Sequence, residues 1–146
     1  MICLDELVKL ISVKAKNRGY KKAGLTWYKD KADLTVILSI QKSQFDTKTW
    51  YYNYGICLHG ISSEKYHTLN ACQIRYTVDC VPDGVALNSD DVISLLEKWE
   101  DMYGNLKLLR IRAVQGKLPI QSTLDAIRYL TTVDVTKIES FPAATD

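Results

Sequence analysis

Two residues with reactive side chains, Cys57 and His59, stand two positions apart in one predicted strand of this sequence. In an extended chain this spacing directs both side chains to the same face, with Cα atoms about 6.8 Å apart. A thiol nucleophile needs a base within hydrogen-bonding reach, so the separation is marginal for a Cys–His dyad. A half-buried cysteine beside a surface histidine explains the pair without catalysis, and we favour that interpretation.

The same pair is followed by His67 and Cys72, and all four side chains are of types that bind zinc. Structural zinc sites usually place roughly two to four residues between paired ligands and repeat that form in a second pair. The spacings C-x-H and H-x4-C match neither half, so we predict no metal site. The sequence also lacks a glycine-rich phosphate loop, a G-x-S-x-G elbow and an H-E-x-x-H motif, and we expect no cofactor.

Polar and aromatic side chains share one face of the predicted strands. Tyrosine is common at binding surfaces because its rigid ring supplies contact area and its hydroxyl supplies direction. Cross-strand pairing within the sheet explains the same aromatic residues without a partner, so both interpretations stay open. The candidate binding residues on this face or at its rim are Tyr28, Gln41, Ser43, Tyr51, Asn53, His59 and Arg75.

Hydrophobic periodicity predicts the elements that position these residues. Apolar residues recur at helical spacing over residues 3–18, and Gly19 then ends the helix. Strict alternation of apolar and polar residues predicts four strands, at residues 25–28, 34–41, 50–59 and 72–80. Short connections favour the antiparallel order 1-2-3-4, with one apolar face and one polar face.

The sequence leaves the structure open at two places in the strand region. Gly55, inside the third strand, indicates either a bulge or the close approach of another group, and we favour the bulge. The connection at 60–71 is longer than a tight hairpin, and it fits one helical turn around residues 63–67 without requiring it.

After the turn at 82–84 the apolar period changes from two to about 3.6, which predicts a helical C-terminal half. Asn88 or Ser89 caps a helix that ends at Gly104. Residues 105–115 fit either a helix or an edge strand, and their length together with a closing glycine favours the helix. Ser122 begins a capping box before the last helix.

This order of elements predicts an α+β fold. We expect an N-terminal helix, a four-stranded antiparallel meander, and two or three C-terminal helices packed on one face of the sheet. A chain of 146 residues suits one core, so we predict a single domain over residues 1–139 and a flexible tail at 140–146.

Composition narrows the class of partner. Hydrophobic residues make up 47% of the chain and the net charge is +2, which favours neither a nucleic-acid nor a membrane partner. The N-terminus lacks the basic-then-apolar pattern of a signal peptide. We therefore expect a cytoplasmic protein whose four cysteines, at positions 3, 57, 72 and 80, stay free.

The segments G-Y-K-K-A-G-L-T-W-Y, I-Q-K-S and N-Y-G-I resemble a family pattern. That pattern, G-F-K-K-x-G-x-T-F-Y, then Q-K-S, then N-x-G-I, belongs to a bacterial family known as domain of unknown function 4304. The likeness covers about residues 15–60, and it implies a small, freestanding, cytosolic bacterial protein without supplying catalytic residues. Gln41, Ser43 and Asn53 are its polar motif positions, and turn chemistry is a second explanation for Ser43.

Two functions from different classes follow from these observations. The first is a non-enzymatic binding protein that presents its polar sheet face to another protein, either as an immunity-type neutraliser of a toxin or to a second copy in a homodimer. The alternative is a small hydrolase or nuclease-like enzyme that uses His59, His67 and Arg75, with Cys57 as its nucleophile.

Overall fold

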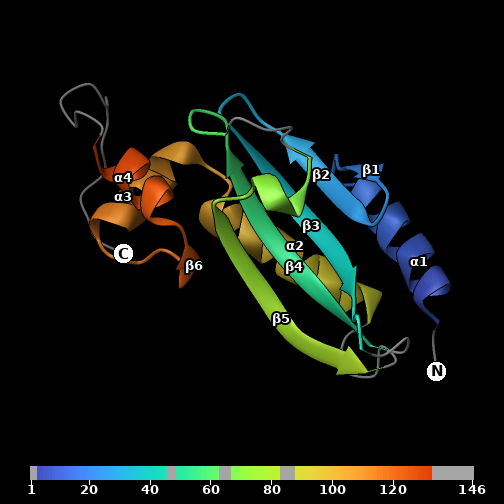
Figure 1. The fold of residues 1–146 in the computed structure, drawn as a ribbon. Helices are drawn as coiled ribbons and strands as arrows, with labels where there is room; N and C mark the ends of the chain where they lie inside the picture. The colour runs from blue at the N-terminus through green and yellow to red at the C-terminus, as the bar shows by residue number, and fades with distance from the viewer. Residues whose placement is uncertain (1–2, 46–48, 63–66, 83–87, 133–146) are drawn as a thin grey trace.

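Six strands form one antiparallel sheet in the order β1-β2-β3-β4-β5-β6 (Figure 1). The computed structural model describes residues 3–45, 49–62, 67–82 and 88–132, without the side chains of 79–82. The predicted α+β class and the antiparallel order are confirmed. The four predicted strands are present with small shifts at their ends, as β2 (Thr26–Asp30), β3 (Leu34–Lys42), β4 (Thr49–Leu58) and β5 (Ile74–Pro82).

Two short edge strands make the predicted count of four wrong. β1 (Lys21–Ala23) joins β2 through a two-residue hairpin loop in which Gly24 has a φ of 62°. The side chains of β1 are all exposed, so no alternation of burial marks this strand in the sequence. β6 (Gln121–Ser122) pairs with the first two residues of β5, and two residues are too few for a periodic signal.

Two helices cover the apolar face of the sheet, which we call the helix face. Figure 1 shows α2 (Ser89–Tyr103) crossing behind the central strands, with α1 (Leu4–Lys16) beside β1 and β2. The Asn88 side chain accepts a hydrogen bond from the Asp91 amide, which confirms the predicted cap of α2. The large side chains that this face buries include Trp27, Leu38, Tyr52, Tyr54 and Ile56.

The last two helices stand at the end of the sheet instead of lying across it. α3 (Leu106–Val114) and α4 (Leu124–Thr131) pack against each other beside the start of β5 (Figure 1). The helical interpretation of residues 105–115 is therefore confirmed. The predicted Ser122 cap is wrong by one residue, because the Thr123 hydroxyl accepts from the Ala126 amide while Ser122 donates to the Pro119 carbonyl.

The polar face, which we call the outer face, carries the odd-numbered residues of β3 and β4. The expectation that helices would cover only one face of the sheet is corrected, because part of the outer face is covered too. The short helix η1 (Leu69–Ala71) lies in front of β3 and β4 (Figure 1). With its neighbours it buries Ile37, Cys57 and Cys72.

Gly55 makes this cover possible. It pairs in regular register with Ile37 and Arg75, and the irregularity in the β4–β5 ladder lies instead between Trp50 and Tyr52. A Cβ atom on Gly55 would lie only 2.6 Å from the Cys72 Sγ atom. Close approach of another segment, and not the bulge that we favoured, explains this glycine.

Several sequence predictions fall wholly or partly outside the described residues, among them the turn at 82–84 and the end of the predicted domain at 133–139. Residues 63–66, which form most of the helical turn considered at 63–67, also lie outside, and so does the predicted tail at 140–146. No helix within the described ranges is long and apolar enough to cross a membrane.

Candidate functional site

A chain of hydrogen bonds joins both histidines of the protein at one end of the outer face. Thr35 donates its hydroxyl proton to Asp30 Oδ1 at 2.7 Å, and because a hydroxyl has one proton, its oxygen accepts from His59 Nε2 at 2.7 Å. On the other side of the carboxylate, His67 Nε2 lies 2.8 Å from Asp30 Oδ2. The His67 ring also stacks on Tyr28, with 3.7 Å between ring centroids.

This hydrogen-bond chain attaches the segment 67–73 to the sheet. Burial by itself raises the pKa of Asp30, but the hydrogen bonds from Thr35 and His67 outweigh it and hold that pKa below its ordinary range. The Asp30 carboxylate is therefore charged at neutral pH. It connects β2 and β3 to the segment 67–73, which covers part of the outer face. Thr35 and Asp30 were not among the predicted site residues, although they connect two that were considered.

Cys57 does not have the environment of a nucleophile. It lies opposite Thr35 in the β3–β4 ladder and is completely buried beneath η1. Burial raises the pKa of its thiol above the ordinary value of 9.0, although a hydrogen bond with Ser62 lowers it. Since the thiolate is the reactive form, a buried neutral thiol is unsuited to attack. His59 Nε2 contacts Thr35, so the geometry gives no support to a Cys57–His59 dyad.

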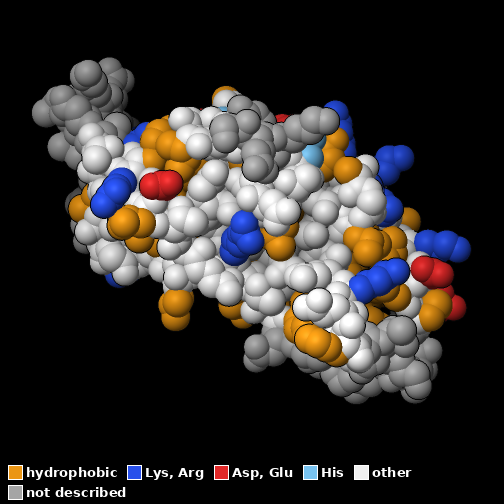
Figure 2. Space-filling view, viewed as in Figure 1, with side chains coloured by type: hydrophobic (Ala, Val, Ile, Leu, Met, Phe, Trp, Pro, Cys, Tyr) orange, Lys and Arg blue, Asp and Glu red, His pale blue; other side chains and the backbone are white. Residues whose placement is uncertain are grey.

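Arg75 holds the other end of the cover. Its Nε donates to the Cys72 carbonyl at 2.9 Å, and its Nη2 donates to the Asn70 carbonyl at 3.3 Å. Both acceptors belong to the end of η1, where helix carbonyls lack partners within the helix. Figure 2 shows a small Lys/Arg patch near the middle of this face, which is otherwise largely uncharged.

The open half of the outer face carries neutral side chains that bond to one another. Asn53 is only 3% exposed, accepts from the Thr77 hydroxyl at 2.7 Å and donates to Gln41 at 3.4 Å. Tyr51 is half-buried beside them. Ser43 accepts a backbone hydrogen bond two residues along the chain, which is the turn role considered from the sequence.

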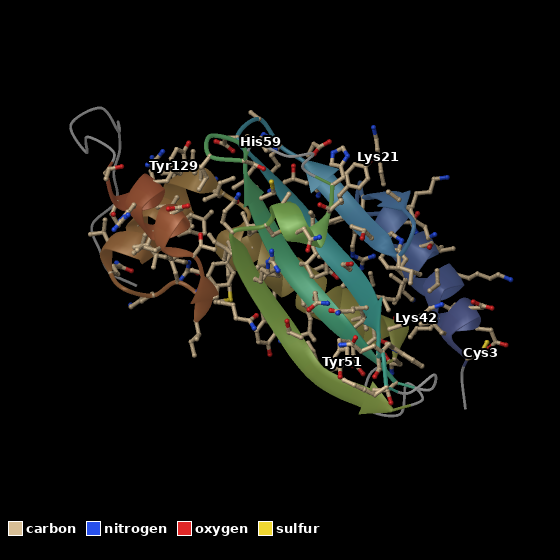
Figure 3. All side chains as sticks on the ribbon, in the orientation of Figure 1. Cys3, Lys21, Lys42, Tyr51, His59 and Tyr129 are labelled. Carbon is tan, nitrogen blue, oxygen red and sulfur yellow. The ribbon has the colours of Figure 1, made fainter. Side chains whose placement is uncertain are left out.

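The predicted binding residues therefore share a face without forming one site. Figure 3 shows His59 and Tyr51 near opposite ends of β4. The candidates at the His59 end belong to the hydrogen-bond chain, and those at the Tyr51 end belong to the open half, with Arg75 between them. Their role in binding stays a prediction.

A groove that sequence reasoning missed runs beside the edge of β5 that faces away from β4, and its volume is about 590 Å³. The centroid of the Tyr76 ring lies 6.3 Å from those of both Tyr54 and Trp99, and Trp99 lies 4.8 Å from Tyr103. The lining residues are Tyr54, Arg75, Tyr76, Thr77, Leu95, Lys98, Trp99, Met102, Tyr103, Pro119, Ile120 and Gln121.

The floor of this groove is fixed and its rim is open. Trp99 Nε1 donates to the Gly55 carbonyl at 3.1 Å, and the Tyr54 hydroxyl donates to the Val92 carbonyl at 2.9 Å. The rim is exposed by contrast, because Tyr76 retains 48% of its surface, Met102 41%, and Ile120 all of it. Large apolar side chains that stay exposed around a preformed hollow are typical of a binding surface.

One backbone edge of the sheet is available next to the groove. β6 pairs only with Ile74 and Arg75, so from Tyr76 onward no described strand occupies the edge of β5 that faces away from β4. Such an edge presents backbone donors and acceptors to any extended chain that approaches it.

The charged groups of the groove have one sign. Arg75 and Lys98 line it, and none of the lining residues that the structure describes is a carboxylate. The arrangement therefore suits an apolar ligand that also carries a negative charge.

The sequence carried only a partial signal for this groove. Trp99 and Met102 fall on the apolar stripe of α2, which predicts that both are core residues. Because α2 ends beside the sheet's edge, the last turn of this stripe is only partly covered. Ile120 precedes a two-residue strand and has no periodic context. The one usable indication was that the fourth predicted strand, which contains Tyr76, had no strand after it.

Comparison with known proteins gives one match. The model of a family described as Domain of unknown function (DUF4304) matches residues 11–107, from within α1 to the start of α3. That range goes beyond the 15–60 segment indicated by the motifs and includes β5 and α2, which form most of the groove. No curated protein and no solved structure matches the chain.

Proposed function

Since this chain belongs to the DUF4304 family, whose description names no reaction, we propose its function from its own surface. It is a non-catalytic protein-binding module, and its contact surface is the groove beside β5. The observation that carries the proposal is an open aromatic hollow, about 590 Å³ in volume, next to a sheet edge that no described strand occupies.

The remaining polar chemistry favours binding over catalysis. Asp30 and Thr35 use their side chains to hold His59 and His67, and the thiol of Cys57 is buried. A general base acts on a proton within hydrogen-bonding reach, and these groups are instead directed at one another. They stabilise the cover of the outer face.

The composition of the groove supports a protein partner. Interfaces concentrate their binding energy in a few aromatic and arginine residues, usually surrounded by a rim that excludes water. Tyr76 and Trp99 form such an aromatic centre, with Met102 and Ile120 at the rim. Methionine adapts its shape to a partner at low cost, which suits this position.

The open half of the outer face has a secondary place in this proposal. Thr77 lines the groove and bonds to Asn53 on that face, so a partner seated on the edge of β5 also lies close to Asn53. Neutralisation of a toxin is one form that such binding takes, and a toxin gene beside this one would favour it.

Photo-crosslinking in the native host tests the proposal. A benzoylphenylalanine at position 120 places the reactive group on the rim of the groove. Val13, an apolar residue of α1 with 62% exposure, is the matched control, and Tyr51 represents the outer face. We expect one discrete protein adduct from position 120 that position 13 does not form.

The outcome separates the two candidate surfaces. An adduct that forms from position 51 but not from position 120 would move the contact surface to the outer face. If positions 120 and 13 give the same products, the groove has no specific partner and the proposal fails.

A further inference from the structure

We propose that the groove binds one extended segment of the partner as an added antiparallel strand on β5, and that this segment carries a large apolar residue close to an acidic one. This inference rests on the proposed function and adds the mode and chemistry of recognition.

The backbone of β5 directs hydrogen-bonding groups toward the open side. The Thr123 amide donates to the Gln73 carbonyl at 2.8 Å, so this carbonyl faces β6, whereas the Gln73 amide donates to Ile56 of β4. The Ser43 amide bonds to Thr49 and the His59 amide to Asp33, so odd-numbered residues of β4 face β3 and even-numbered ones face β5. Their partners in β5 are the even-numbered Ile74 and Tyr76, which leaves Arg75 and Thr77 facing the β6 edge. Arg75 lies opposite Gln121, and Thr77 is the first outward-facing residue beyond the end of β6.

β6 already pairs with the first residues of β5, and the rest of that edge of β5 has room for another strand. Its two residues pair with β5 in antiparallel register, and the chain before them departs at a turn in which the Ser122 amide and hydroxyl both bond to the Pro119 carbonyl. Ile120 therefore projects into solvent. A partner strand running in the direction of β6 fits beside Thr77 with its C-terminal end toward Ile120.

The flanking side chains select what such a strand carries. Side chains of a strand alternate between faces, so every second residue of the added segment lies on the Tyr76 side, above Trp99 and Met102. With a volume of about 590 Å³, the groove has room for a large aliphatic or aromatic side chain. The intervening residues lie on the side of Thr77, among neutral polar groups.

The charges select an acidic segment. Lys98 is exposed on the wall of the groove and forms no ion pair with a described residue, while Arg75 lies on the opposite side. With two cations and no carboxylate among the described lining residues, an Asp or Glu near the apolar anchor is attracted to the groove.

The test uses the whole chain and a phage-displayed library of random linear dodecapeptides as the probe. We expect enriched peptides to place Asp or Glu within about two residues of a large apolar residue and to avoid Lys and Arg. In the best synthetic peptide, N-methylation of the alternate amides that face β5 should weaken binding at least tenfold. Methylation of the intervening amides should change binding less than about twofold.

Variants of the protein give an independent readout of charge and position. Lys98→Glu should weaken peptide binding about tenfold, and Ile120→Glu should do the same. Lys9→Glu is the matched control, because it makes the same charge change on the exposed side of α1, and it should leave binding within about twofold. All three positions are exposed, so folding is preserved.

The failure of this inference is distinguishable from failure of the proposed function. Three results would overturn strand addition even if position 120 still crosslinks to a protein. They are a selection that enriches no peptide, an equal loss of affinity from both sets of N-methyl amides, and an unchanged affinity in Lys98→Glu. A homodimer in sedimentation experiments that Thr77 and Ile120 variants disrupt would also overturn it, by making a second copy the occupant. Absence of any specific adduct at position 120 would remove the proposed function itself.

Discussion

The Sγ atom of Cys72 occupies the space that a side chain on Gly55 would need, only 2.6 Å from the position of an ideal Cβ. This contact seats η1 directly on the backbone of β4. It explains how a strand of a two-layer fold accepts a cover on its second face without losing register, because the glycine keeps its regular pairs on both sides.

Gly55→Ala should therefore destabilise the protein by about 1 to 3 kcal/mol, the usual cost of overpacking a tight contact. Urea unfolding followed by tryptophan fluorescence measures this change. In a Cys72→Ala background the cost of Gly55→Ala should fall, because the sulfur that meets the new methyl group is gone. An equal cost in both backgrounds would mean that the Cys72 contact is not the cause.

Thiol labelling should separate the cysteines by burial. Cys3 is exposed and should react with iodoacetamide at an ordinary rate, whereas Cys57 and Cys72 should react about 100-fold more slowly because both are buried and burial raises the pKa of each thiol. A Cys80→Ser variant simplifies the readout by mass spectrometry. Fast labelling of Cys57 in the folded protein would revive the catalytic-thiol hypothesis.

Glu100 on α2 joins the helix layer to the sheet through three donors. It accepts from the Tyr20 hydroxyl at 2.7 Å and pairs with Lys29 at 3.0 Å and Lys31 at 3.2 Å. Glu100→Gln should cost about 2 kcal/mol, since hydrogen bonds to a partly buried charge are strong. The control is Glu97→Gln, which removes an exposed pair with Arg18 and should cost less than about 1 kcal/mol.

The same carboxyl group predicts a pH dependence. Burial alone raises the pKa of Glu100, but hydrogen bonds from Tyr20, Lys29 and Lys31 outweigh it and place that pKa below the ordinary 4.5. A carboxyl with a lower pKa in the folded chain stabilises the fold above the unfolded pKa, and this contribution is lost as pH falls through the folded pKa.

The free energy difference between the wild-type protein and Glu100→Gln should thus be constant near neutral pH and shrink below about pH 4.5. Urea titrations at a series of pH values measure it. A difference that grows on acidification would contradict the assigned direction of the pKa shift.

His67→Ala should loosen the cover of the outer face. The variant loses the bond to Asp30 and the stacking on Tyr28, at a cost of about 1 kcal/mol. Amide hydrogen exchange should accelerate at Ala71 and Cys72, whose amides bond within this segment, while α2 keeps its protection. Unchanged exchange at both amides would show that other contacts hold the segment.

Alternation and capping signals accounted for most of the fold. The helix face of β3 and β4 was predictable because a shift of one residue would have exposed every apolar side chain. β1 escaped prediction because its three side chains are all exposed, so its sequence resembles a polar loop. Gly24, which permits the hairpin, was the residue that marked it.

The candidate sites were less predictable because they depend on segments distant in sequence. The segment that contains η1 and covers the outer face has no hydrophobic periodicity. Two residues nevertheless indicated that something covers this face: Ile37, which is apolar among polar neighbours, and Gly55. The groove needs Tyr76, Trp99 and Ile120 from three separate elements. The pairing of β5 with β6 and the placement of α2 bring them together, and local patterns predicted neither.

Hydroxyl-radical footprinting of the protein, alone and in the complex isolated from its host, tests the central claim most directly. If the groove is the contact surface, oxidation of Met102 and Tyr76 should fall several-fold in the complex, because both are more than 40% exposed in the single chain, while Tyr51 should be oxidised as before. Protection of Tyr51 with undiminished oxidation of Met102 and Tyr76 would contradict the claim and place the partner on the outer face.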